Sequence, residues 1–158
     1  MESKVFTQYG YPIIVVSLAA IVGMVIAFVL NNGIPKEGLI PIAVVTVSLI
    51  VAILMTYKMT ICVDDRYVWF RMGIGLVGKT YELSDISECR IVRLYSSGVR
   101  KIRNGNLYSI HGFKGIELKF HSTNRVVRLG TNRPDELCGA INNAISKSKR
   151  KKGVYYYL

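Results

Sequence analysis

The sequence predicts an α+β protein with two apolar helices in an N-terminal hairpin, then an antiparallel β-barrel or roll that a C-terminal helix caps. Three observations predict this fold class. The first 57 residues hold two long uncharged runs, the following segments alternate apolar and polar residues, and an amphipathic stripe lies near the end. A chain of 158 residues has room for one small domain besides the hairpin.

The two apolar runs cover residues 11–30 and 39–57, and neither holds a charged residue. A helix needs about 20 apolar residues to cross about 30 Å of hydrocarbon, so we expect both runs to span a membrane. A cleaved signal peptide with one span and a buried soluble hairpin are the alternatives. The first run is longer than a signal-peptide core and ends in Asn31-Asn32-Gly33 without a cleavage site, which favours the hairpin.

Basic residues near the ends of the runs predict the orientation. The connector holds only Lys36, whereas Lys58, Arg66 and Arg71 follow the second run. Because Lys and Arg are enriched on the cytoplasmic side, we expect a multi-pass protein with both termini in the cytoplasm.

The net charge of +11 belongs to the β-rich part, because residues 1–57 hold two Lys and two Glu that cancel. An anionic leaflet attracts such a domain by about 1 kcal/mol for each Lys or Arg near the surface. The lipid bilayer, and anionic lipids within it, are therefore the expected partners. Nucleic acid is not expected, because aromatic residues do not interleave with the basic ones as in a stacking platform.

Small residues recur on one face of the first run. Ala19, Gly23 and Ala27 lie four residues apart, one on each helical turn. Small side chains let helix backbones approach closely in lipid, so we expect this face to pack against another helix. The second run of the same chain and a second copy of the protein both remain candidates.

Short strands are expected after the second run, at residues 59–63, 67–72, 79–83, 89–95, 107–110, 116–121 and 125–129. Alternation with a period of two marks a strand that buries one face. The segment 96–106 is expected to be a basic loop. Pro134 suits the first position of a helix, and Asp135 and Glu136 suit its positive N-terminal end. The predicted division is a hairpin at 1–58, a β domain at 59–146 and a polybasic, tyrosine-rich tail at 147–158.

The segment Gly73-Ile74-Gly75-Leu76-Val77-Gly78-Lys79-Thr80 matches the phosphate-binding pattern GxxxxGK[ST]. That site needs a strand before the loop and a helix after it. Here a short, turn-prone segment follows instead, so we expect a glycine-rich turn between antiparallel strands. A nucleotide-binding loop is the distant alternative.

Two basic clusters are the candidate contact residues for anionic lipid or a partner. The first comprises Arg100, Lys101 and Arg103, and the second comprises Lys147, Lys149, Arg150, Lys151 and Lys152. An ordinary solvated surface is the alternative for both. The two histidines have no ligands at metal spacing, and the cysteines form no CxxC pair. We therefore expect no metal, no cofactor and no enzymatic activity.

Residues 59–146 resemble the bacterial pleckstrin-homology (PH-like) domain that follows membrane helices. Four segments carry the resemblance: 73–83, 83–86, 103–105 leading to 112–113, and 126–131 with 134–137. The resemblance implies a seven-stranded bent barrel closed by a C-terminal helix, in a bacterial cytoplasmic membrane. It also implies a binding or scaffolding role toward a protein partner or a second copy. A sensor of anionic lipid headgroups is the alternative.

Overall fold

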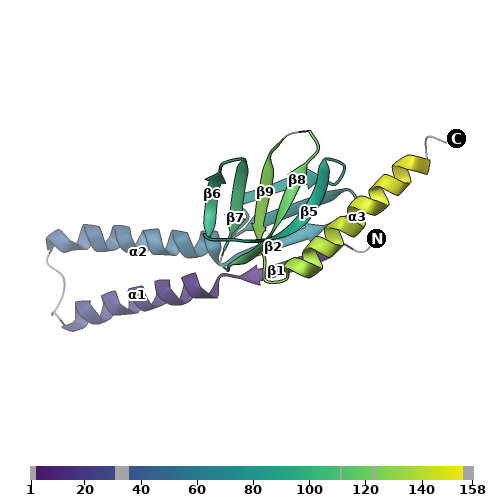
Figure 1. Ribbon diagram of the computed structural model, residues 1–158. Coiled ribbons are helices and arrows are strands. Elements are labelled where there is room, and N and C mark those ends of the chain that lie inside the picture. Colours follow the sequence, from purple (N-terminus) through teal and green to yellow (C-terminus); the bar gives the residue numbers. More distant parts are fainter. Residues whose placement is uncertain (1–2, 31–35, 111, 123, 155–158) are drawn as a thin grey trace.

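Three helices and two sheets make up the residues that the computed structural model describes, which are 3–30, 36–110, 112–122 and 124–154. The expected α+β class is confirmed. Helices α1 (Tyr11–Leu30) and α2 (Lys36–Thr56) lie side by side and extend from one end of the β-rich body, whereas α3 (Pro134–Val154) extends the other way (Figure 1). Residues 147–154, expected in the tail, continue α3.

The first sheet is antiparallel, in the order β1-β2-β3-β4. Its strands are β1 (Lys4–Tyr9), β2 (Lys58–Val63), β3 (Tyr67–Met72) and β4 (Val77–Glu82). The sequence did not predict β1. Its partner β2 follows it only after both apolar helices, so no local pattern reveals the pairing.

The second sheet has the order β5-β8-β9-β7-β6. Its strands are β5 (Ile86–Arg93), β6 (Gly98–Ile102), β7 (Gly105–Ser109), β8 (Lys114–Phe120) and β9 (Val126–Gly130). The expected loop at 96–106 is wrong, because β6 lies within it and pairs with β7. The antiparallel expectation is also wrong for β7 and β9, which run parallel. The described residues thus hold nine strands instead of seven, and the resemblance to PH-like domains stays a prediction.

The hydrophobic core joins the two sheets and α3. Phe70 of the first sheet, Ile116 and Leu129 of the second, and Leu137 and Ile141 of α3 belong to one buried cluster. These apolar side chains on α3 recur at helical spacing, so one face of the helix packs on the body while its polar face meets solvent. The expected C-terminal amphipathic helix is confirmed, and it packs on the β-rich body.

Helix α1 is long and apolar enough to cross a membrane. Among the residues that the structure describes it is the one helix that meets both requirements, since the corresponding part of α2, Ile40–Thr56, is shorter. The predicted two-span topology stays a prediction, and the connector at 31–35 lies outside the described residues.

The small-residue face of α1 does not face α2. Ala19, Gly23 and Ala27 are all exposed, and a Cβ atom on Gly23 would meet no atom within 4 Å. Ser17 is the buried residue of α1 instead. Among the described residues, Ala19 and Gly23 therefore do not pack against α2, and contact of the small-residue face with a second copy stays a prediction.

Candidate functional site

The candidate site is the end of the β-rich body from which α1 and α2 leave, which we call the helix-side rim. Strand β1 leads into α1 through Gly10, and α2 leads into β2 through Tyr57. The two strands pair from Lys4↔Val63 to Tyr9↔Lys58, and the Gly10 N–H donates to the Tyr57 carbonyl at 2.9 Å. Both helices are therefore fixed to one sheet at the same end.

The glycine-rich turn, residues 73–76 between β3 and β4, also belongs to the helix-side rim. Met72, the last residue of β3, pairs with Met59 beside the end of α2, so the turn lies at that end. The Gly73 N–H donates to the Lys58 carbonyl at 2.7 Å, and the Ile74 N–H donates to the Leu54 carbonyl at 3.1 Å. The turn thus satisfies a carbonyl in the last turn of α2, where the helix itself offers no donor.

The same geometry shows what the segment that matches the phosphate-binding pattern forms. Lys79 and Thr80 lie in β4, where they pair with Phe70 and Trp69 of β3. The expected turn between antiparallel strands is confirmed. Because a strand follows the loop, the loop has no helix N-terminus, whose amides hold phosphate in nucleotide-binding proteins.

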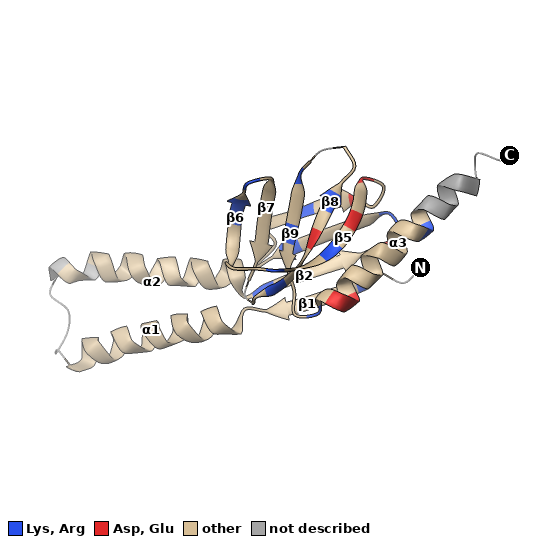
Figure 2. Cartoon of the chain, in the orientation of Figure 1, with Lys and Arg blue, Asp and Glu red and all other residues tan. Residues whose placement is uncertain are grey.

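Strand β6 carries the first basic cluster and forms an edge of the second sheet, at the end of the body from which α1 and α2 extend in the view of Figures 1 and 2. Arg100 and Lys101 are exposed on this strand, and Arg103 is exposed in the turn that follows. None of the three takes part in the described ion pairs. Among the described residues, the charges of these three side chains therefore have no acidic partner within ion-pair distance.

The second basic cluster lies elsewhere. Helix α3 runs from the body in the direction opposite to α1 and α2, so Lys147 near its C-terminal end is remote from the helix-side rim (Figure 1). The side chains of Lys149, Arg150, Lys151 and Lys152 lie outside the described residues. The structure does not bring the two predicted clusters together.

Aromatic side chains mark the start of α1. The rings of Tyr9 and Tyr11 lie 5.8 Å apart between centroids, and both are exposed. Tyr57 lies at the end of α2, half-buried. Tyrosine is enriched where helices leave a membrane, because its ring is apolar and its hydroxyl polar. Sequence reasoning missed these residues, although their position at the ends of two apolar runs was a usable signal.

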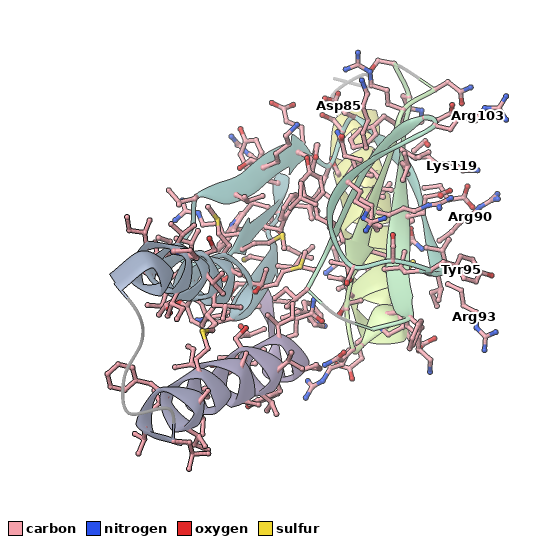
Figure 3. The ribbon with its side chains drawn as sticks, turned by 90° about the vertical axis from the view of Figure 1, so that its left-hand side faces the viewer. Asp85, Arg90, Arg93, Tyr95, Arg103 and Lys119 are labelled. Carbon is pink, nitrogen blue, oxygen red and sulfur yellow. The ribbon has the colours of Figure 1, made fainter. Side chains whose placement is uncertain are left out.

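The outer face of the second sheet is the other charged surface. Arg90, Arg93, Tyr95, Arg103 and Lys119 point outward there (Figure 3). On this face Arg90 Nε donates to Glu88 at 2.6 Å and Arg128 Nε donates to Glu117 at 2.8 Å. The hydrogen bond from Arg90 lowers the pKa of the Glu88 carboxyl. Acidic partners therefore offset part of the positive charge here, unlike on β6.

Comparisons of the chain with known protein families, curated proteins and solved structures give no match. Functional inference therefore rests on the chain's own residues.

The cysteines are free and buried. Burial raises the pKa of the Cys89 thiol, and a hydrogen bond with Cys138 adds to the effect. Such thiols are poor nucleophiles, because the thiolate is the reactive form. Within the described ranges, no group of three or more His, Cys, Asp or Glu residues is arranged to hold a metal ion.

Proposed function

We propose that the protein is a membrane-anchored, non-enzymatic binding module. In this proposal α1 and α2 cross the bilayer as a hairpin, and the β domain is held at the cytoplasmic surface. The observation that carries the proposal is the junction at Gly10 and Tyr57, where both apolar helices join paired strands of one sheet.

The junction favours a fixed orientation over a flexible tether. One residue separates β1 from α1, and one separates α2 from β2. The β1–β2 ladder and the turn bonded to Leu54 give further attachment points. A module held in this way presents the same surface to the bilayer at all times, which suits docking of a partner at the membrane.

The absence of charge in both apolar runs supports an anchoring role. Neither run from residue 11 to 30 nor from 39 to 57 holds an ionisable side chain of the kind that lines ion or proton pathways. The proposal therefore assigns binding to the β domain and attachment to the helices.

Extraction of membranes tests the anchoring. The full-length chain is expected to stay in the membrane fraction after high salt and alkaline carbonate, and to leave it only with detergent. Salt removes proteins that are bound by charge alone, because it screens their attraction to lipid. Release of the folded chain by carbonate would refute the proposal.

A second candidate function, contact with anionic lipid headgroups, is favoured by the position of β6. Strand β6, which carries the exposed Arg100 and Lys101, lies at the end of the body from which the helices leave (Figure 2). If α1 and α2 cross a bilayer, β6 and its basic residues lie close to the bilayer surface. Each then contributes about 1 kcal/mol of attraction to an anionic leaflet.

The test compares nanodiscs with and without anionic lipid. Binding to the folded state raises thermal stability, so wild type is expected to unfold at a higher temperature in anionic nanodiscs, with the difference reduced by salt. Arg100→Gln, Lys101→Gln and Arg103→Gln together should remove the difference. The matched control neutralises Lys147, Lys149 and Arg150, which alters charge equally at the remote end of α3. An undiminished difference in the β6 variant would overturn this candidate.

A further inference from the structure

We infer that the glycine-rich turn, residues 73–76, is a second membrane contact, in which Ile74 and Leu76 insert into the bilayer beside the end of α2. The inference rests on the proposed anchoring by α1 and α2, and it adds a lipid-binding site made by the β domain itself. The predicted basic clusters do not include this turn.

Position is the first argument. The Ile74 N–H bonds to the Leu54 carbonyl, so the turn touches the last turn of an apolar helix. Contact with the helix is close, because a Cβ atom on Gly73 would lie only 2.2 Å from the Leu54 carbonyl oxygen and 2.6 Å from that of Met55. Wherever the end of α2 meets the bilayer surface, residues 73–76 lie at the same level.

Chemistry is the second argument. Ile74 is 56% exposed and Leu76 is 68% exposed, yet both are large and apolar. The segment from Gly73 to Gly78 contains no polar side chain at all. Solvent-exposed turns are ordinarily polar, so this composition favours an apolar environment, and the described residues leave both side chains largely uncovered.

The turn at the opposite end of the same sheet is charged instead of apolar. Strands β2 and β3 are joined there by Asp64, Asp65 and Arg66, all exposed and all charged. The two ends of one sheet thus differ in polarity, and the apolar end is the one in contact with α2. A bilayer on the side of α2 accounts for both turns, whereas water on both sides accounts only for the charged turn.

The neighbours of the turn fit the bilayer surface better than a protein partner. Leu54, whose carbonyl holds the turn, has an exposed side chain, so an apolar surface continues from the helix to Ile74. Arg71, just before the turn, is exposed and lies with its guanidinium carbon 5.5 Å from the centre of the Trp69 ring. A cation beside an indole suits the headgroup level, because both groups are amphipathic.

Tryptophan scanning in brominated lipid tests the inference with the full chain. The native Trp69 is replaced by Phe, and single tryptophans are placed by Ile74→Trp and Leu76→Trp. Two matched variants calibrate the scale: Val22→Trp in the middle of α1, and Tyr95→Trp just after β5, where the side chain is 89% exposed. Each variant is reconstituted in nanodiscs whose lipids carry bromine on their acyl chains. Bromine quenches the fluorescence of a tryptophan that approaches it closely.

The expected result is strong quenching at positions 22, 74 and 76, and little at position 95. Emission at 74 and 76 should also lie at shorter wavelength than at 95. Quenching at 22 with none at 74 and 76 would overturn this inference and leave the anchoring intact. A shift to shorter wavelength without bromine quenching would mean that protein, such as a second copy, covers the turn, which also overturns it. Absence of quenching at 22 would refute the anchoring and the inference together.

A milder variant keeps the test valid if a tryptophan disturbs folding. Leu76→Cys, labelled with an environment-sensitive fluorophore, reports the polarity at the same point. The native cysteines are buried and do not compete for the label. An apolar signal in nanodiscs supports insertion, and a signal equal to that of Tyr95→Cys contradicts it.

Discussion

Substitution of Gly73 by Ala should detach the glycine-rich turn from α2 and destabilise the whole β domain. Gly73 has a φ of +57°, which an L-residue adopts only with strain. The new Cβ atom would also lie 2.2 Å from the Leu54 carbonyl oxygen, a backbone atom that cannot rotate away. Two separate penalties therefore act at one position.

The expected size follows from those two penalties. A left-handed backbone costs a residue with a Cβ atom about 1–2 kcal/mol. Overpacking against a fixed neighbour adds about 1–3 kcal/mol. The sum of about 2–5 kcal/mol corresponds to a fall in Tm of roughly 4–20 °C, since 1 kcal/mol shifts Tm by about 2–4 °C at this chain length.

The buried cysteines supply the assay. A thiol-reactive fluorogenic dye labels Cys62, Cys89 and Cys138 only as the protein unfolds on heating in detergent. Gly75→Ala is the matched control, because Gly75 also has a positive φ, +95°, but its Cβ atom would meet nothing within 4 Å. Gly73→Ala should therefore lower Tm further than Gly75→Ala. Equal losses would refute the close contact between the turn and α2.

Two further predictions compare matched substitutions, and a third concerns the Cys89 thiol. Gly10→Ala should lower the unfolding free energy by about 1–3 kcal/mol, because the new Cβ atom would lie 2.4 Å from the Thr56 carbonyl oxygen and overpack the junction. Gly23→Ala, whose Cβ atom would meet nothing within 4 Å, should be neutral or slightly stabilising in the same melting assay. Asn142→Ala should cost about 1–3 kcal/mol, because the Asn142 amide bonds to both the N–H and the carbonyl of Cys89. Asn143→Ala should change the unfolding free energy by less than about 0.5 kcal/mol, and equal effects would contradict the role of the Asn142 amide. Because the pKa of the Cys89 thiol is raised, raising the pH from neutral to 9 should leave its alkylation in the folded protein slow, and rapid alkylation measured by mass spectrometry would contradict its burial.

The sequence predicted the elements whose signals are local. An uncharged run predicts an apolar helix, and alternation along β3 and β8 predicts strands that bury one face. The missed strands depend on distant partners. β1 pairs with β2 across two helices, and the short, basic β6 is held by β7, although the Asn104-Gly105 turn signal was present.

The sequence indicated which residues belong to the candidate site, but it did not indicate how they are arranged in space. The basic residues of β6 were found from charge alone, but only the fold places β6 at the edge of its sheet and Lys147 in the part of α3 that extends away from α1 and α2. Ile74 and Leu76 lie within the segment that matches the phosphate-binding pattern, and the sequence did not predict that their side chains are exposed. The pairing of Met72 with Met59 and the hydrogen bond from the Ile74 N–H to the Leu54 carbonyl place that turn at the end of α2.

The sidedness of two single cysteines tests the central claim most directly, namely that a helical hairpin crosses the membrane and holds the β domain on the cytoplasmic side. Asn32→Cys lies in the connector, and Tyr95→Cys lies on the β domain at an exposed position. A membrane-impermeant maleimide should label Asn32→Cys only from outside intact cells, and Tyr95→Cys only in inverted vesicles. Labelling of both positions from the same side would contradict the account.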